Sequence, residues 1–407
     1  MTLDKAIRWT FYALALFLPF SISGAQAALA LLCLLLVVRA GLRRQIPHPG
    51  EPVGWLIVAL VGWVLLAAPF ALYPDLTWPR LAKYWIWLTY FVALASFGDW
   101  PTARRAVSLL VFAAGATAIY GIAQHIFGDA VPRYFVPPVT LWQKTGGYYH
   151  AVGMFDHHLT YGNNLIIIIL LGMGLWFETQ PWRQRIVLGI ALLLCTFGLL
   201  WSYARSAWIG LVAGLMIFAG LKGKRALIIT LAVISLLGLA AVKTSPTLAD
   251  RIQRAFISEK NLERIYTWKT TVDMIVDHPV TGIGPGAYRT LTELYRQNYN
   301  IHWTARSHAH NSYLQIAAES GLAAGLAFTA LIVTLFALGI AHHRDISCHN
   351  PGKNLLAGAV GACTAFAAAS LLQHNAGDAE VCMVFLFAAA LLVFLVKSIP
   401  KESHDAH

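Results

Sequence analysis

Charged side chains are scarce in this chain of 407 residues. Asp, Glu, Lys and Arg together make up 12% of the sequence, about half the share that is usual in a soluble domain. Hydrophobic residues make up 58%, and the mean hydropathy is +0.61. A soluble globular enzyme and a disordered chain are therefore both excluded, because neither combines so much apolar surface with so little charge.

Cysteine is rare too, and this excludes a disulfide scaffold. Cys33, Cys195, Cys363 and Cys382 lie inside apolar runs, and Cys348 lies in a short basic loop. No two of them have the spacing of a thiol pair or of a metal site. We interpret them as small buried hydrophobic residues.

Long apolar runs recur over almost the whole length. A helix needs about 20 apolar residues to cross a bilayer, and these runs are too long and too continuous for the strands of a membrane barrel. The sequence predicts an all-α polytopic membrane protein with about twelve transmembrane helices. We expect the spans at residues 8–23, 25–40, 54–70, 81–97, 106–127, 161–178, 186–201, 205–220, 226–242, 314–341, 355–373 and 380–397.

Lys and Arg in the short loops indicate the orientation, because cytoplasmic loops are enriched in these residues. Alternate loops carry Arg43, Arg44, Arg104, Arg105, Arg183, Arg185, Lys222, Lys224, Arg225, Arg344, Lys353 and Lys397. We therefore place that side, and both termini, in the cytoplasm. The opposite side then faces the periplasm or the exterior.

The expected topology divides the chain into three parts. Residues 1–242 hold spans one to nine and an outer loop at 128–160, residues 243–313 form a large outer loop, and residues 314–407 hold the last three spans and a cytoplasmic tail. The large loop has an amphipathic helical pattern around Trp268, which is typical of helices on a membrane surface. A loop of this length usually carries function.

The large loop ends in a polar run where the chain re-enters the membrane: Arg306, Ser307, His308, Ala309, His310, Asn311, Ser312 and Tyr313. A His in this place can act as a general base or donate hydrogen bonds to an anion. The alternatives are a metal site, although no nearby carboxylate or Cys completes a ligand set, and a pair of solvated interfacial histidines. The three glycines of 282–286 fit a phosphate cradle or, with better support, a plain turn.

Three basic residues lie in or beside predicted spans on the outer side: Arg80, Lys83 and Arg205. Ionisable side chains at membrane depth are costly and are therefore candidates for function. Arg205 could instead extend its charged end to the lipid headgroups. The same alternative, a headgroup contact in place of a substrate phosphate, holds for Arg80 and Lys83.

The end of the large loop resembles the O-antigen ligases of Gram-negative bacteria, within the O-antigen ligase and polymerase superfamily. In the family pattern a His, followed by Asn, Ser or Gln, precedes nine residues and a Gly. Here His310 and Asn311 precede nine residues and Gly321. The pattern continues with two residues and then Gly, Thr or Tyr, where this sequence departs with Ala324, a small residue inside a predicted helix.

Two arginines extend the resemblance. The outer arginine of the family matches Arg205, with Ile209 where the family has a Leu-like residue, and the arginine that precedes a Trp in the large loop matches Arg264 with Trp268. The motifs cover about residues 201–325, while the topology agrees over the whole chain. The combination of motifs is more specific than any one of them.

The resemblance implies a metal-independent enzyme without cofactors and with a GT-C-like glycosyltransferase fold in the bacterial inner membrane. It would transfer a polysaccharide from undecaprenyl diphosphate to a sugar hydroxyl of lipid A-core on the periplasmic side. Its partners would be the lipid-linked donor, lipid A-core and membrane lipids, with no nucleic acid. Catalytic roles fall to His310, Arg205 and Arg264, with His310 as base or as the group that positions the hydroxyl.

Six further residues are expected to bind substrate: Arg80, Lys83, Asn311, Arg306, His308 and Tyr313. We expect His310 rather than His308 to be catalytic, with His308 further out and solvated. Three other functions stay open. They are an O-antigen polymerase, a protein O-oligosaccharyltransferase with the same donor and, less favoured because no internal repeat is seen, a transporter.

Overall fold

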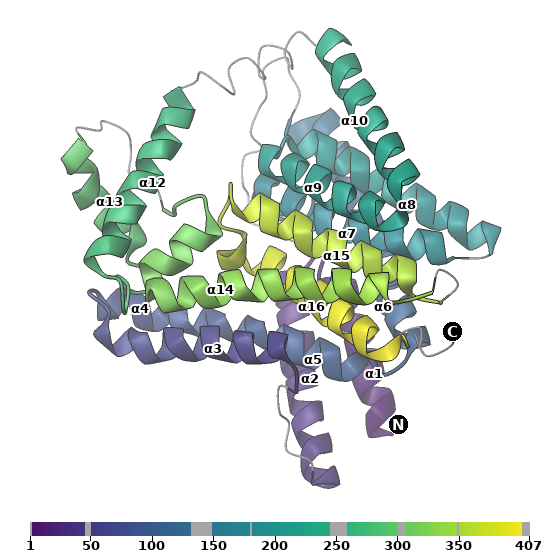
Figure 1. Cartoon of the computed structure of the whole chain (residues 1–407), viewed down its shortest axis with the longest axis horizontal. Helices are drawn as coiled ribbons and strands as arrows, with labels where there is room; N and C mark the ends of the chain where they lie inside the picture. Colours follow the sequence, from purple (N-terminus) through teal and green to yellow (C-terminus); the bar gives the residue numbers. More distant parts are fainter. Residues whose placement is uncertain are drawn as a thin grey trace, which may run out of the picture.

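The computed structural model is all-helical over the residues it describes, which are 2–44, 50–131, 149–179, 181–244, 259–299, 307–347 and 350–400. These ranges contain no strand, and eight of their helices are long and apolar enough to cross a membrane. The polytopic helical class is thus confirmed (Figure 1). The number of twelve spans and the GT-C-like fold stay predictions.

The long helices, in chain order, are α1 (Leu3–Phe17), α2 (Ile22–Arg43), α3 (Pro52–Ala67), α5 (Leu88–Phe97), α6 (Trp100–Phe127), α7 (His158–Glu178), α8 (Trp182–Ser202), α9 (Arg205–Lys222), α10 (Lys224–Thr244), α12 (Glu259–Asp277), α14 (Ser312–Arg344), α15 (Lys353–Ser370) and α16 (Ala379–Ser398). Shorter helical pieces join them: η1 (Ala68–Phe70), α4 (Pro74–Leu81), η2 (Ala82–Trp87), η3 (Gly128–Ala130), α13 (Tyr288–Tyr295), η4 (Arg296–Tyr299) and η5 (Asn375–Gly377).

The first helical hairpin turns earlier than the predicted boundary between residues 23 and 25. Helix α1 ends at Phe17, and α2 begins after Ser21, whose Oγ accepts a hydrogen bond from the Gly24 N–H at 3.1 Å. A serine in this position satisfies one of the amides that a helix start leaves open. Pro19 lies in the turn, where its missing N–H costs nothing.

The predicted span 81–97 is not one continuous helix. Helix α4 contains Pro79, the chain tightens into the 3₁₀ helix η2, and only then does α5 begin. Proline in a helix interior removes a hydrogen bond and clashes with the preceding turn, so Pro79 disturbs α4, and the 3₁₀ helix η2 separates α4 from α5. The break matters for function, because Arg80 and Lys83 lie in α4 and η2.

Helix α16 forms the centre of the bundle. It is the most apolar of the eight candidate spans, and 83% of its apolar window is buried. A helix that is hydrophobic all round belongs in an interior, and α5, α7, α14 and α15 pack around it. Helix α15 approaches α9 so closely that a Cβ on Gly210 would lie 2.6 Å from the Ala365 carbonyl oxygen. Small residues commonly permit such contact between membrane helices.

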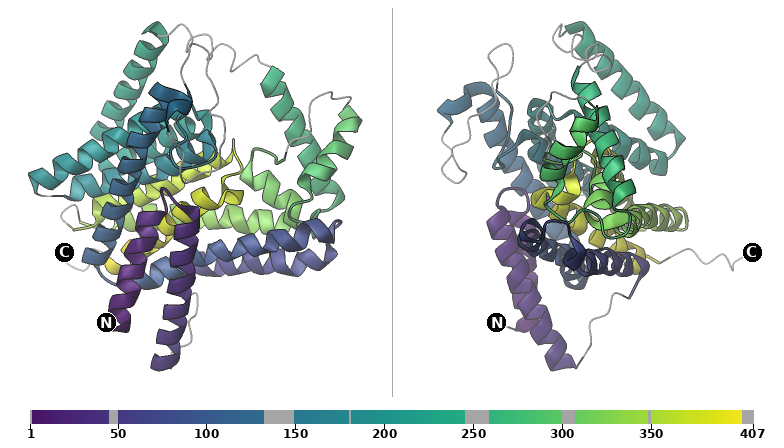
Figure 2. Two further views of the ribbon diagram at one scale, coloured as in Figure 1. Left: turned by 180° about the vertical axis from the view of Figure 1, so that it is seen from behind. Right: turned by 90° about the vertical axis from the view of Figure 1, so that its left-hand side faces the viewer.

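The loops predicted to face the cytoplasm lie at one end of the bundle. Gly352 packs against Trp100 and Ile399, and Asn354 accepts a hydrogen bond from the Lys222 ammonium group. At the other end α12 and α13 lie side by side beyond the start of α14 (Figures 1 and 2). The assignment of these ends to cytoplasm and periplasm stays a prediction.

We expect cysteine labelling to decide the orientation. In a background without the native cysteines, Gln297→Cys beside α13 should react with a membrane-impermeant maleimide in intact spheroplasts. Ser398→Cys, at the end of α16, should react only after the membrane is permeabilised. Both positions are exposed, so access to solvent does not differ between them. Labelling of Ser398→Cys in intact spheroplasts would reverse the orientation and move the site described below to the cytoplasmic side.

Candidate functional site

Helix α14 is broken near its start. Gly321 has φ 83° and ψ 167° inside the helix, a conformation that only glycine adopts without strain. The break frees backbone groups that a membrane protein must satisfy. Three carbonyl groups before the break accept hydrogen bonds from outside the helix: Ala318 from the Ile283 N–H (2.9 Å), Glu319 from the Gly284 N–H (2.9 Å) and Ser320 from the Trp63 Nε1–H (3.0 Å). After the break, the Leu322 N–H donates to the Pro279 carbonyl oxygen (2.8 Å).

The glycine loop 282–286 fills the space between this break and α4. A Cβ on Gly284 would lie 2.5 Å from the Thr77 Oγ1, and one on Gly286 would lie 2.7 Å from the Arg80 Cγ. The amides of both glycines donate to Glu319, to its carbonyl oxygen and its Oε1 respectively. The loop therefore binds a carboxylate of the protein itself, and the phosphate-cradle interpretation is wrong for these two amides.

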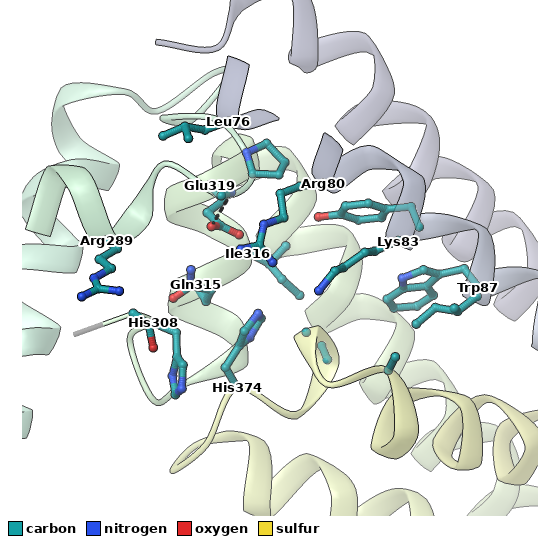
Figure 3. Close-up of a pocket in the computed structure, with 18 of the residues that line it drawn as sticks. Leu76, Arg80, Lys83, Trp87, Arg289, His308, Gln315, Ile316, Glu319 and His374 are labelled. Carbon is teal, nitrogen blue, oxygen red and sulfur yellow. Dashed lines mark hydrogen bonds between the residues drawn. The ribbon is translucent and has the colours of Figure 1, made fainter. Parts of the chain in front are cut away.

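A cavity of about 510 Å³ opens beside the break. It lies between α3, α4 with η2, α13, the start of α14 and the segment that follows α15 (Figure 3). Its lining residues are Leu60, Leu76, Arg80, Lys83, Tyr84, Ile86, Trp87, Pro285, Gly286, Arg289, Thr290, Ser307, His308, Gln315, Ile316, Glu319, His374, Ala376, Gly377 and Ala379. The lining combines apolar side chains with charged and hydrogen-bonding groups.

Three cations line this cavity against one carboxylate. Arg80 and Lys83 extend into it from α4 and η2, and Arg289 extends from α13 on the facing side (Figure 3). Glu319 lies between them and accepts the Gly286 N–H at 2.9 Å. The excess of positive charge suits an anion with several oxygens, because a guanidinium binds phosphate oxygens through two parallel hydrogen bonds.

His308 lines the cavity, and its hydrogen bonding fixes its tautomer. The His308 Nδ1 accepts the backbone N–H of His310 at 3.2 Å. A neutral imidazole carries one proton, so that proton lies on the His308 Nε2. In this state His308 offers a hydrogen-bond donor and not a base.

His310 has the opposite tautomer. Its Nδ1 lies 2.8 Å from the Oε1 of Gln373. An amide oxygen only accepts hydrogen bonds, so the His310 Nδ1 carries the proton and the basic lone pair lies on Nε2. His310 also has φ 51°, an unusual backbone conformation for a residue other than glycine. The ring centroids of His308 and His310 are 4.2 Å apart.

His374 is a third histidine at the cavity. Burial, and secondarily the nearby His310, lower the pKa of His374 to about 4, so its ring is neutral at physiological pH. Its Nδ1 is buried and has no hydrogen-bond partner among the described residues. A buried polar atom without a partner is costly.

The turn that carries His308 and His310 is held from two sides. The Nε1–H of Trp268 on α12 donates to the Ala309 carbonyl oxygen at 3.0 Å, and the Ala309 N–H donates to the Gln315 Oε1 at 2.6 Å. Asn311 caps α14, since its Oδ1 accepts two backbone N–H groups of the first turn. The large loop thus positions the histidines.

The predicted site residues separate into two groups. Arg80, Lys83 and His308 line the cavity, and His310 and Asn311 are next to it in the same turn. His308 and His310 are both half-buried, so the expectation that His308 is the solvated one of the pair is not met.

The other predicted residues do not line this cavity. Arg205 is the exposed first residue of α9 at the same end of the bundle, and Arg264 lies on α12. The hydroxyl of Tyr313 donates to the Ala367 carbonyl oxygen on α15 at 3.3 Å, which directs it toward that helix. Arg306 lies outside the described residues.

Among the lining residues that the sequence did not single out, four carry charged or strongly hydrogen-bonding side chains close to the predicted ones: Arg289, Gln315, Glu319 and His374. Arg289 lies in the predicted outer loop 243–313, and His374 lies in the connector between the last two predicted spans. Glu319 is an acidic residue within a predicted span, and that is a signal which could have found it. The other three carry no such signal.

Fold and cavity together define a polytopic all-helical membrane protein with a cation-lined polar cavity at one end of its bundle. Residues 190–329 match the family model described as O-Antigen ligase, which confirms the resemblance to that family. The chain is also similar to a Haemophilus influenzae protein named "Uncharacterized protein". The two are 25% identical over 284 residues, which cover 63% of this chain and 69% of that relative.

The break at Gly321 can be tested by substitution. Gly321→Ala should destabilise the protein by at least about 2 kcal/mol, because a Cβ there collides with the Val280 carbonyl oxygen and φ is positive. The matched control is Gly220→Ala, at an exposed position with nothing within 4 Å of the added Cβ. Thermal unfolding in detergent compares the two. An unchanged midpoint in Gly321→Ala would show that the break is not required.

Proposed function

We propose that this protein is an O-antigen ligase. It transfers a polysaccharide from undecaprenyl diphosphate to a sugar hydroxyl of lipid A-core on the periplasmic side of the inner membrane. The observation that carries the proposal is a cation-lined cavity beside two histidines of opposite tautomer. Both histidines lie within the stretch that matches the family model.

The cations serve the leaving group. When the acceptor oxygen attacks the anomeric carbon, a new C–O bond forms, and the bond from that carbon to the diphosphate breaks. Its electron pair leaves on the diphosphate oxygen. Arg80, Lys83 and Arg289 offer fixed positive charge at that place. One preorganised donor of this kind contributes roughly 3–4 kcal/mol to transition-state stabilisation.

His310 receives the proton. Its Nε2 bears the lone pair because Nδ1 donates to Gln373, so His310 has the tautomer that a general base requires. His308, with its proton on Nε2, donates a hydrogen bond to a substrate oxygen in the cavity. The pair thus supplies an acceptor and a donor two residues apart.

Arg205 and Arg264 retain a proposed role through the family motifs. Arg205 lies at the same end of the bundle as the cavity but is not among its lining residues. We assign it, with Arg264, to contact with the glycan or with the donor after binding. Among the described residues no group of three His, Cys, Asp or Glu side chains is placed to hold a metal ion. Metal independence stays a prediction.

Transfer in vitro tests the proposed function. Purified protein, undecaprenyl-diphosphate glycan and lipid A-core should yield glycan-bearing lipid A-core on a gel, with equal yield in the presence of EDTA, because fixed cations and not a metal stabilise the leaving group. Elongation of the lipid-linked glycan without lipid A-core would indicate a polymerase, and transfer to a protein would indicate an oligosaccharyltransferase. Binding of donor without turnover would favour a transporter.

The two histidines should differ in effect. His310→Ala should lower kcat by about 10²–10⁴-fold, the range for loss of a general base, whereas His308→Ala removes one hydrogen-bond donor and should cost roughly tenfold. His278→Ala, half-buried in the same loop but away from the cavity, is the matched control. Single-turnover rates separate chemistry from binding. Wild-type kcat in His310→Ala, with a large loss in His308→Ala, would reverse the two roles.

A further inference from the structure

A second cavity adjoins the first. Its volume is about 650 Å³, and it lies between the starts of α2, α7 and α16 and the helix η2. Six residues line both cavities, namely Lys83, Ile86, His308, His374, Gly377 and Ala379. Lys83, His308 and His374 are the polar side chains of this shared wall.

The two cavities have opposite charge. The first has three cations against the single carboxyl group of Glu319, whereas the second has three acidic residues, Asp156, Asp378 and Glu380, and only the shared Lys83 as a cation. A diphosphate is attracted to the first and repelled from the second. The second cavity therefore suits a different part of the reaction.

Asp378 is fixed in the second cavity and retains hydrogen-bonding capacity. The Thr160 Oγ1 on α7 donates to its Oδ2 at 2.5 Å. Burial and the neighbouring Glu380 carboxyl raise the pKa of Asp378 well above its usual range. The Asp378 Oδ1 and the His374 Nδ1 are buried and have no hydrogen-bond partner among the described residues. Two such atoms at one cavity indicate that a ligand supplies the missing partners.

A neutral ring with many hydroxyl groups satisfies these atoms. Each hydroxyl both donates and accepts a hydrogen bond, which matches a carboxyl oxygen and a ring nitrogen that lack partners among the described residues. Gln26 adds an amide, and Trp85 adds an aromatic side chain that is half-buried. A free diphosphate or another strongly anionic group has no counterpart here except the shared Lys83.

We infer that the second cavity is the subsite for the acceptor sugar, held by Asp378, Glu380 and Gln26. The inference rests on the proposed function, which requires a sugar hydroxyl beside the donor. Gln373 supports it independently, because this residue lines the second cavity and also holds the Nδ1–H of His310. Gln373, which fixes the tautomer of His310, thus also lines the cavity assigned to the acceptor sugar.

Kinetics with both substrates tests the subsite. Asp378→Asn and Gln26→Ala should raise the KM for lipid A-core by about tenfold or more and leave the donor KM within about twofold. Arg289→Lys in the first cavity should do the reverse. Asp273→Asn is the matched control, since this carboxylate on α12 accepts the Tyr299 hydroxyl at 2.6 Å without lining either cavity. Its KM values should not change.

A thermal-shift titration with lipid A-core alone separates this inference from the proposed function. Stabilisation of the wild type that Asp378→Asn and Gln26→Ala both lose supports the subsite, even where no transfer occurs and the proposed function fails. Transfer by the wild type with an unchanged acceptor KM in both variants would overturn the subsite and leave the function intact. The Gln26 variant keeps the test valid if Asp378→Asn does not fold, because alanine suits the helix of α2.

Discussion

The break in α14 is the constraint on which the candidate site depends. An unbroken helix would satisfy its own carbonyl groups. At Gly321 the hydrogen bonds within the helix are interrupted, and backbone groups of the chain after α12 supply partners instead. The glycine loop 282–286 can approach closely enough only without side chains, and in doing so it contacts α4. One local backbone conformation thus joins the large loop, α4 and α14 around a common space.

The same break positions the Glu319 carboxylate in the cavity. Glu319 lies two residues before Gly321, where its carboxylate accepts the amide of Gly286 and lies between the cations of the cavity. The three cations of the cavity outnumber this carboxylate, so the cavity attracts negative charge. In the proposed reaction, the anion that binds there is the donor's diphosphate.

Sequence patterns predicted the parts of the site that show a local signal. Arg80 and Lys83 were chosen because charge near a membrane is costly, and both line the cavity. The motif from His310 to Gly321 lies in the turn and the broken helix beside the cavity. The role of the glycine as a break was not apparent from the motif, since only tertiary contact with the 279–284 segment shows why φ must be positive.

What could not be predicted depends on which segments meet. Arg289 follows a loop, and His374 lies in a connector between two predicted spans. Neither has a spacing that indicates function, because their place at the cavity arises from the packing of α13 and η5 against α14. The predicted continuous span 81–97 was wrong in its first part, because residues 82–87 form the 3₁₀ helix η2 and only Leu88–Phe97 is α-helical.

The alternation of roles between His308 and His310 follows from the turn itself. The His310 N–H donates to the His308 Nδ1 within this turn. The positive φ of 51° at His310 turns its own side chain, whose Nδ1 meets Gln373, an acceptor from another segment. Each ring therefore has its Nδ1 occupied, one as acceptor and one as donor, so the two Nε2 atoms must differ in protonation. A backbone conformation that costs about 1 kcal/mol or more in this way gives two identical side chains complementary chemistry within two residues.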